Sequence, residues 1–315
     1  MVEIKSLLSN ANDSFKGKIF IGDDPDLKIK KISSGIKILD DILGGGVPRG
    51  RSIVISGEFS TGKTFLTQKF IETSQKDGLS CVFIDAEKAV DPEWFKMTGI
   101  DLNKLIVARP NTGEEGIDMI IHFLKENVDL IVLDSLAALV PSSEISENME
   151  QQFIGLQSRL INKGFRKILA ENNNTVFIAI NQLRESIGKP GIFKSMPGGK
   201  GQYFFSSIIL EVSRKEWIKN KEDQKVGFII RCLTSKNKLA SPFQTAEIPF
   251  NFITGQVDYA FILFEVALEM NLITKQRNTY MYGEVKLGVG KDNSICTIQQ
   301  DAKLMTELKE KINIK

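Results

Sequence analysis

The stretch Ser52–Thr64, SIVISGEFSTGKT, decides the fold of this chain. It begins with an apolar run of strand length, and its last eight residues match the pattern G-x-x-x-x-G-K-[ST]. Glycines let the backbone wrap a phosphate closely, and the N–H groups of the loop and of the following helix N-terminus point at the anion. The stretch therefore predicts a phosphate-binding loop in which Lys63 reaches the β- and γ-phosphates and the Thr64 hydroxyl binds Mg²⁺. A chance match in a glycine-containing turn is the alternative, and it does not explain the strand before the loop or the helix after it.

The same kind of apolar run recurs along the chain. Strand-length runs occupy 81–85 (CVFID), 130–134 (LIVLD), 176–180 (VFIAI) and 207–212 (SIILEV). Helical stretches at 64–75, 114–126 and 150–171 separate them. Strands that are apolar on both faces and alternate with helices are typical of a parallel sheet buried between helices. The expected fold class is therefore α/β, a P-loop nucleotide-hydrolase core with a mostly parallel twisted sheet.

The pattern changes at both ends of this core. Residues 1–30 are mixed, with a short helix expected over 2–8. After residue 256 we expect one helix over 258–273, a strand pair within 279–288 and a last helix over 301–311. The chain is thus predicted to comprise an N-terminal segment (1–30), a core (31–256) and a small α+β domain (257–315).

Composition excludes several classes of protein. The 315 residues carry 41 Lys and Arg against 39 Asp and Glu, a net charge of +2, which rules out a polybasic protein but allows a local basic stripe. Three widely spaced cysteines argue against a disulfide framework or a zinc site, and they suit a reducing, cytoplasmic location. One histidine leaves almost no room for a histidine-based metal site or a Ser-His-Asp triad. No apolar run reaches 18 residues, so we expect no membrane span.

Polar residues stand at the ends of three other predicted strands. Asp134 ends one of them and is expected to hold Mg²⁺ beside the phosphate loop, although an isolated Asp there is more often a turn residue. Glu87 follows another strand, where a carboxylate can activate a water for attack on the γ-phosphate. Gln182 follows a third, where an amide can hydrogen-bond the γ-phosphate and report its loss. Taken alone, Glu87 is better explained as an exposed loop glutamate, and a simple strand cap is the alternative for Gln182.

Five further segments, in this order behind GEFSTGKT, make the sequence recognisable. They are FIDAEKAVDP (83–92), DSLAALVP (134–141), INQLR (180–184), PGGKGQYFFSS (197–207) and TSKNKLASPF (234–243). Together they closely resemble the RecA recombinase family, over about residues 10–290 and nearer to the bacterial type than to the eukaryotic one. The divergence is large enough to fit a relative carried by a phage or mobile element.

The resemblance implies roles for matching residues around ATP and Mg²⁺. Glu87 matches the catalytic glutamate, Asp134 the metal-side aspartate and Gln182 the glutamine that senses the γ-phosphate. Lys236 and Lys238 match two lysines that reach the γ-phosphate bound by a neighbouring subunit. The remaining nucleotide contacts are implied for Gly57, Glu58, Phe59, Ser60, Thr61, Gly62, Lys63, Thr64 and Phe65 in the loop, and for Asp91 and Trp94 around the base. Phe252 falls where the family places an aromatic side chain against the nucleotide of the neighbouring subunit, although a core phenylalanine would look the same. Glu58 and Phe59 depart from the family's usual Pro-Glu, and Trp94 stands where the family stacks a tyrosine.

Two segments of the sequence are candidates for DNA contact. Arg159, Asn162 and Arg166 are spaced three and four residues apart, so they share one side of the predicted helix. That arrangement suits phosphate contacts and equally suits an ordinary solvated face. The second segment, 183–204, is long and rich in glycine. The resemblance implies DNA contacts at Ile154, Arg159, Asn162, Arg166, Arg184, Ile187, Gly198, Gly199 and Lys200.

Together, these expectations predict an ATP-dependent DNA strand-exchange recombinase. Its subunits would form helical filaments on single-stranded DNA and pair it with homologous duplex DNA, with ATP and Mg²⁺ bound and no membrane involved. Two alternatives stay open: a hexameric helicase or motor on the same core, and an ATP-gated DNA-binding scaffold with weak hydrolysis.

Overall fold

Apolar strands without polar alternation build the centre of the structure, because strands covered by helices on both faces bury every side chain. The computed structural model describes residues 4–15, 19–146, 155–185, 194–220 and 222–312. The chain divides into two compact units, Met1–Lys31 and Ile32–Lys315.

The first unit contains the helix α1 (Ile4–Phe15) and the 3₁₀ turn η1 (Pro25–Leu27). The expectation of a short helix over 2–8 is wrong in length. No glycine or proline interrupts the residues of α1, so nothing in the sequence stops the helix before Phe15. Asp24 precedes η1, and its carboxylate accepts a hydrogen bond of 2.9 Å from the Asp26 N–H.

The second unit is built on a nine-stranded sheet with the order β13-β12-β11-β10-β3-β7-β6-β4-β5. Six neighbouring strands are parallel: β10 (Ile208–Lys219), β3 (Arg51–Gly57), β7 (Val176–Gln182), β6 (Leu130–Asp134), β4 (Cys81–Asp85) and β5 (Leu105–Ala108). Three antiparallel strands extend the sheet: β11 (Lys225–Asn237), β12 (Thr245–Asn251) and β13 (Gln256–Val257). The five strands expected from apolar runs are confirmed. Strands β5, β11, β12 and β13, which are short or carry polar residues, had no assignment from the sequence.

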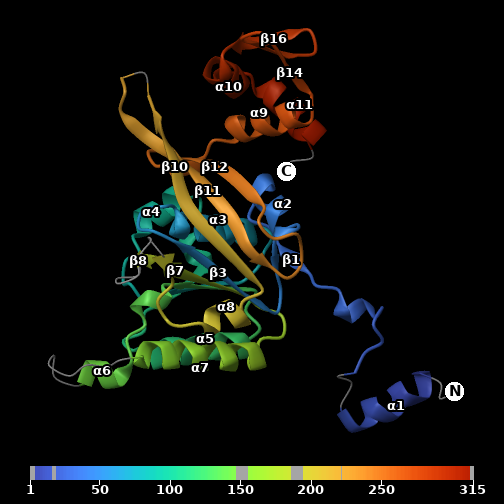
Figure 1. The fold of residues 1–315 in the computed structure, drawn as a ribbon, viewed down its shortest axis with the longest axis vertical. Helices are drawn as coiled ribbons and strands as arrows, with labels where there is room; N and C mark the ends of the chain where they lie inside the picture. The colour runs from blue at the N-terminus through green and yellow to red at the C-terminus, as the bar shows by residue number, and fades with distance from the viewer. Residues whose placement is uncertain (1–3, 16–18, 147–154, 186–193, 221, 313–315) are drawn as a thin grey trace. The chain divides into compact units, whose positions relative to one another are not determined.

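Helices cover both faces of the sheet (Figure 1). Successive residues of β3 point to opposite faces. Ile53 and Ile55 pack in one core cluster with Phe65 of α3 (Lys63–Lys76), and Val54 packs in a second cluster with Phe165 of α7 (Leu156–Glu171). Helix α4 (Pro92–Met97) joins the first cluster through its buried Phe95, and α5 (Gly113–Lys125) joins the second through its buried Ile117. The carboxyl ends of the parallel strands are thereby fixed at one edge, where the candidate site lies.

The last part of the chain forms a three-stranded sheet with three helices. The helices are α9 (Tyr259–Glu269), α10 (Lys291–Gln300) and α11 (Ala302–Ile312), and the strands are β14 (Ile273–Gln276), β15 (Thr279–Tyr282) and β16 (Val285–Val289). The expected helix over 258–273 ends earlier, at Glu269, because Asn271 takes a left-handed conformation (φ 57°) and β14 starts at Ile273. Helix α10 had no assignment from the sequence.

The remaining elements are short connections: β1 (Lys31–Ile32), α2 (Lys37–Leu43), β2 (Val47–Pro48), η2 (Leu102–Lys104), η3 (Leu136–Ala138), α6 (Ser142–Ser146), β8 (Arg184–Glu185), β9 (Lys194–Ser195) and α8 (Gly201–Phe205). None of the described helices combines the length and the apolar character needed to cross a bilayer.

Candidate ATP site and nucleic-acid interface

The phosphate loop connects β3 to α3 and depends on glycines at both of its ends. A Cβ at Gly57 would lie 2.3 Å from the Val212 carbonyl oxygen, and one at Gly62 would lie 2.6 Å from the Ile230 side chain. Gly62 also has φ 93°, which disfavours any residue with a side chain. The sheet therefore packs so tightly behind the loop that only glycine fits at these two positions.

Lys63 is the first residue of α3 and is buried in the loop. Its ammonium donates a hydrogen bond of 2.5 Å to the Glu58 carbonyl oxygen. Burial lowers the pKa of Lys63, and the carboxylates of Asp134, Glu87 and Glu58 oppose that change. A cation held in this way is placed to meet the charge of a bound phosphate.

Thr64 and Asp134 form the candidate Mg²⁺ position. The Thr64 hydroxyl donates to Asp134 Oδ2 at 2.7 Å, so two oxygen ligands of the kind that Mg²⁺ prefers lie next to the loop. Burial raises the pKa of Asp134 to about 6; the Thr64 hydrogen bond and Lys63 oppose this, and Glu87 adds to it. No group of three or more His, Cys, Asp or Glu side chains that could hold a metal occurs among the described residues. Two protein oxygens fit Mg²⁺, which usually completes its shell with phosphate oxygens and water.

Glu87 and Gln182 meet at the neighbouring strand ends. Gln182 Nε2 donates to Glu87 Oε1 at 3.1 Å, and the Ser135 hydroxyl donates to the same oxygen at 2.6 Å. The Glu87 backbone N–H bonds the Asp134 carbonyl oxygen at 3.1 Å, and Gln182 lies opposite Gly57 in the pairing of β7 with β3. The two residues expected at separate strand ends are thus in contact. Ser135 had no assignment from the sequence, although its place directly after Asp134 was a usable signal.

A cavity of about 310 Å³ adjoins the phosphate loop. Its lining comprises Ser60, Thr61, Gly62, Lys63, Thr64, Phe65, Trp94, Phe228, Phe250 and Phe252. The Trp94 and Phe250 rings are perpendicular, with centroids 6.3 Å apart. The structure brings the expected Trp94 to the loop. It also places Phe252 in the cavity of its own chain, whereas the resemblance implies a contact with the neighbouring subunit's nucleotide. Phe228 and Phe250 also line the cavity, and they lie on strands that the sequence patterns did not identify.

Four expected nucleotide contacts are absent from the described residues that line this cavity: Gly57, Glu58, Phe59 and Asp91. Asp91 is exposed and caps α4, with its carboxylate accepting a hydrogen bond of 2.9 Å from the Glu93 N–H. Phe59 is 80% exposed. Glu58 contributes its backbone carbonyl to Lys63.

Lys236 and Lys238 also lie apart from the described lining of the cavity of their own chain. The Lys236 ammonium donates to the Ser206 carbonyl oxygen at 2.7 Å and to that of Tyr203, at the end of α8. Burial, with the adjacent Lys238, lowers the pKa of Lys236. The Lys238 side chain is exposed.

The candidate DNA residues on α7 divide into two kinds. Arg159 and Arg166 are exposed, whereas Asn162 is half-buried and lies against the start of α8. A Cβ at Gly201 would lie 1.7 Å from Asn162 Oδ1, an oxygen that is buried without a hydrogen-bond partner. The three side chains therefore differ in exposure, because the start of α8 packs against Asn162 and leaves Arg159 and Arg166 exposed.

The second candidate segment is described only in part. Gly198 is buried and a Cβ there would lie 2.4 Å from Ile161, so close packing against α7 already requires this glycine. Gly199 is half-buried and Lys200 is exposed. Arg184 lies in β8, of which only the backbone is described. Ile154 and Ile187 lie outside the described residues.

A buried amide pair anchors the root of this segment. Asn181 Nδ2 donates to Gln202 Oε1 at 2.6 Å and to the Pro197 carbonyl oxygen at 2.9 Å. Gln202 Nε2 donates in turn to the carbonyl oxygens of Pro197 (2.7 Å) and Gly199 (3.1 Å). Since Asn181 precedes Gln182, residues 197–202 are fixed directly beside the Glu87–Gln182 contact. Gln202 had no assignment from the sequence.

Comparison with known proteins assigns the family. The model of the RecA N-terminal domain matches residues 3–257, and that of the RecA C-terminal domain matches residues 262–315. Protein RecA of Acholeplasma laidlawii is 39% identical over 303 residues, covering 94% of this chain and 91% of that protein. Protein RecA of Clostridium tetani is 36% identical over 319 residues, covering 99% and 91%, and that of Lactobacillus johnsonii is 37% identical over 306 residues, covering 95% and 84%. This chain belongs to the RecA family of ATP-dependent DNA strand-exchange recombinases, and it resembles the bacterial type.

Proposed function

We propose that this chain hydrolyses ATP at the β3–α3 loop when it is bound to single-stranded DNA, and that it uses ATP to form the filaments in which strands are exchanged. The observation that carries the proposal is the contact of Glu87 with Gln182 beside the phosphate loop. A carboxylate and an amide at that place can orient a water and respond to the γ-phosphate. The family membership supplies the DNA and recombination side of the proposal.

The chemistry follows from the positions of the side chains. Lys63 and the loop N–H groups would bind the phosphates, and Thr64 with Asp134 would hold Mg²⁺, which neutralises charge that develops on the phosphate oxygens. Glu87 would take the proton of the attacking water as the water oxygen bonds to the γ-phosphorus. The bond between that phosphorus and the β,γ-bridging oxygen would break, and ADP would leave with the bridging oxygen. Ser135 and Gln182 hold Glu87 Oε1, so the other carboxylate oxygen is the candidate acceptor for that proton. Trp94 and Phe252 would enclose the base.

Lys236 and Lys238 are proposed to act on the ATP of a neighbouring subunit, as the family resemblance implies. Neither is among the described residues that line the cavity of its own chain, which is consistent with service to a second site. We also propose the division of the chain into residues 1–30, 31–256 and 257–315. A cytoplasmic location is inferred from the proposed DNA partner and from three cysteines that form no disulfide.

The test of the function is steady-state ATP hydrolysis with and without single-stranded DNA, together with electron microscopy of the same samples. We expect strong stimulation by DNA and helical filaments. Stimulation with closed rings would indicate the helicase alternative, and filaments without hydrolysis would indicate the scaffold. A sample with neither stimulation nor filaments would contradict the proposal.

Replacing Arg166 by alanine should weaken the binding of single-stranded DNA. Arg166 is exposed on α7, and losing one phosphate contact should reduce the slope of log affinity against log salt by about 1. The measurement is a fluorescence titration with oligonucleotides of two sequences at several salt concentrations, and both should lose affinity equally. The matched control is Lys167→Ala, which should leave the salt slope unchanged because the Lys167 ammonium lies 3.9 Å from Asp118 of α5. An unchanged slope in Arg166→Ala would place Arg166 on an ordinary solvated face.

A further inference from the structure

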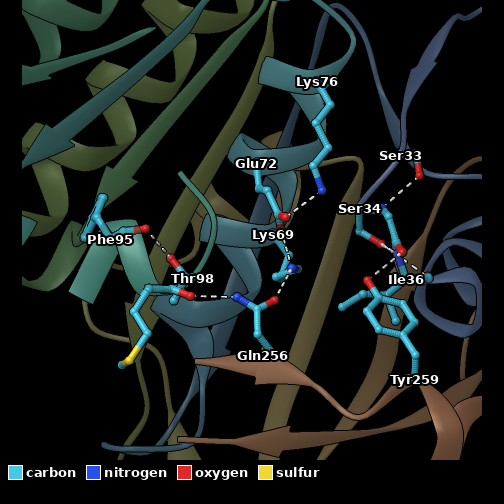
Figure 2. A network of polar contacts seen from close by, with 12 residues as sticks. Ser33, Ser34, Ile36, Lys69, Glu72, Lys76, Phe95, Thr98, Gln256 and Tyr259 are labelled. Atoms are coloured by element: carbon cyan, nitrogen blue, oxygen red, sulfur yellow. Dashed lines mark hydrogen bonds and ion pairs between the residues drawn. The ribbon is translucent and has the colours of Figure 1, made fainter. Parts of the chain in front are cut away.

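The second half of α3, away from the phosphate loop, carries a buried ion pair. The side chains of Lys69 and Glu72 are 3% and 9% exposed, and the Lys69 ammonium contacts Glu72 Oε2. Lys76, with 69% of its side chain exposed, reaches Glu72 Oε1 at 2.7 Å. A buried charge persists only with partners, and Lys69 has a second one, Gln256 Oε1 at 3.4 Å (Figure 2).

Gln256 connects this ion pair to the end of α4. Its Nε2 donates to the Met97 carbonyl oxygen at 2.6 Å, one of the carbonyls that a helix C-terminus leaves unpaired. An amide accepts from an ammonium and donates to a carbonyl at the same time, which a carboxylate or a lysine in its place does not do. Gly255 and Gly99 allow the close approach: a Cβ at Gly255 would lie 2.9 Å from Met97 Cγ, and one at Gly99 would lie 2.6 Å from Glu72 Oε1.

The elements joined in this way are the walls of the ATP cavity. Helix α3 begins with the phosphate-binding Lys63, α4 carries Trp94, and the turn before β13 carries Phe252. Lys69, Glu72 and Gln256 are absent from the described lining of the cavity. They can therefore affect the cavity only through the elements that they connect. Through them the two aromatic walls are tied to the helix that holds the phosphates.

We propose that Gln256, held by the buried Lys69–Glu72 pair, is a positioning residue that sets the base-side walls of the ATP cavity relative to the phosphate-binding helix. The inference rests on the proposed function, because it takes this cavity to bind ATP. It predicts a division of labour: Gln256 controls the part of the affinity that depends on the base, and the loop alone controls the part that depends on the phosphates.

The test uses Gln256→Leu, which keeps the volume of the side chain and removes both hydrogen bonds. Two probes separate the two parts of the affinity: Mg-ATP and inorganic tripolyphosphate with Mg²⁺. We expect the Kd of Mg-ATP to rise about 3- to 10-fold, the loss expected from one or two hydrogen bonds, and the Kd of tripolyphosphate to stay unchanged. The KM for ATP should rise by a similar factor with kcat unchanged.

A spectroscopic readout is built into the chain. It has two tryptophans, so Trp217→Phe leaves Trp94 as the single reporter of the base-side wall. In that background, Gln256→Leu should alter the change in Trp94 fluorescence on adding ATP. Gln256→Glu is the second variant: it keeps the acceptor for Lys69 and loses the donor to Met97, so it should weaken ATP and spare tripolyphosphate in the same way.

Lys76→Met is the matched control, because it removes an exposed partner of the same Glu72 carboxylate and should leave both Kd values unchanged. Equal weakening of ATP and tripolyphosphate in both Gln256 variants would show general destabilisation and overturn the positioning role. If the wild type binds Mg-ATP and a Gln256 variant binds it with the same Kd, the positioning role would also be overturned. A wild type that binds neither probe would instead refute the proposed function.

Discussion

Lys63→Ala should lose ATP binding and hydrolysis, with kcat/KM falling about 100-fold or more. The ammonium is the cation at the centre of the loop, and it lies buried, where its interaction with phosphate charge is weakly screened. Truncation of Lys63 leaves the negative charge of the phosphates uncompensated in a pocket that also holds the carboxylates of Asp134 and Glu87. The measurements are nucleotide binding by calorimetry and hydrolysis in the presence of single-stranded DNA.

Two controls distinguish the loss of ATP binding from a loss of folding. The circular dichroism spectrum and melting temperature should change little, since the Lys63 ammonium contacts the loop and not the core. Lys76→Ala, at the far end of the same helix, should retain activity. ATP hydrolysis at the wild-type rate in Lys63→Ala would mean that the nucleotide binds elsewhere.

Glu87→Gln is expected to bind ATP and form filaments but to lose about 100- to 10,000-fold in hydrolysis, the usual contribution of a general base. The substitution is nearly isosteric, and the amide oxygen can still accept from Ser135 and Gln182. Only the capacity to take a proton from water is removed. Single-turnover hydrolysis and filament imaging with ATP separate the chemical step from assembly.

The matched comparison for this variant is Gln182→Ala. It removes the other member of the contact and leaves the carboxylate, so its loss of hydrolysis should be smaller and its response to DNA should weaken. If Glu87→Gln turned over ATP as fast as the wild type, Glu87 could not be the base. Filaments that no longer form in Glu87→Gln would place this residue in assembly instead.

The local patterns of the sequence were sufficient to predict the phosphate loop, the five buried strands and the position of Asp134 beside the loop. Each of these depends on residues that are near one another in the chain, and a strand, a turn and a helix start leave recognisable spacings. The N-terminal helix and the helix ending at Glu269 were misjudged in length, because helix ends depend on caps and on single backbone conformations such as that of Asn271. Strands β11 and β12 were missed because they mix polar and apolar residues and are defined by the partners beside them.

Local sequence patterns are not sufficient to assign roles to Glu87 and Gln182. Each alone fits an exposed loop residue or a strand cap, and the family resemblance was needed to favour a functional role. Their contact joins positions 95 residues apart in the chain and exists because β4, β6 and β7 are neighbours in the sheet.

The sequence by itself determined the α/β class, the phosphate loop and the family. Only the tertiary structure decided that Ser135 and Gln182 hold Glu87, that α8 covers Asn162, and that Gln256 ties Lys69 to the end of α4. The reason is physical. Hydrophobic period and glycine spacing are properties of consecutive residues, whereas a buried ammonium finds its partner among whichever segments the folded sheet brings beside it, here 187 residues further along the chain.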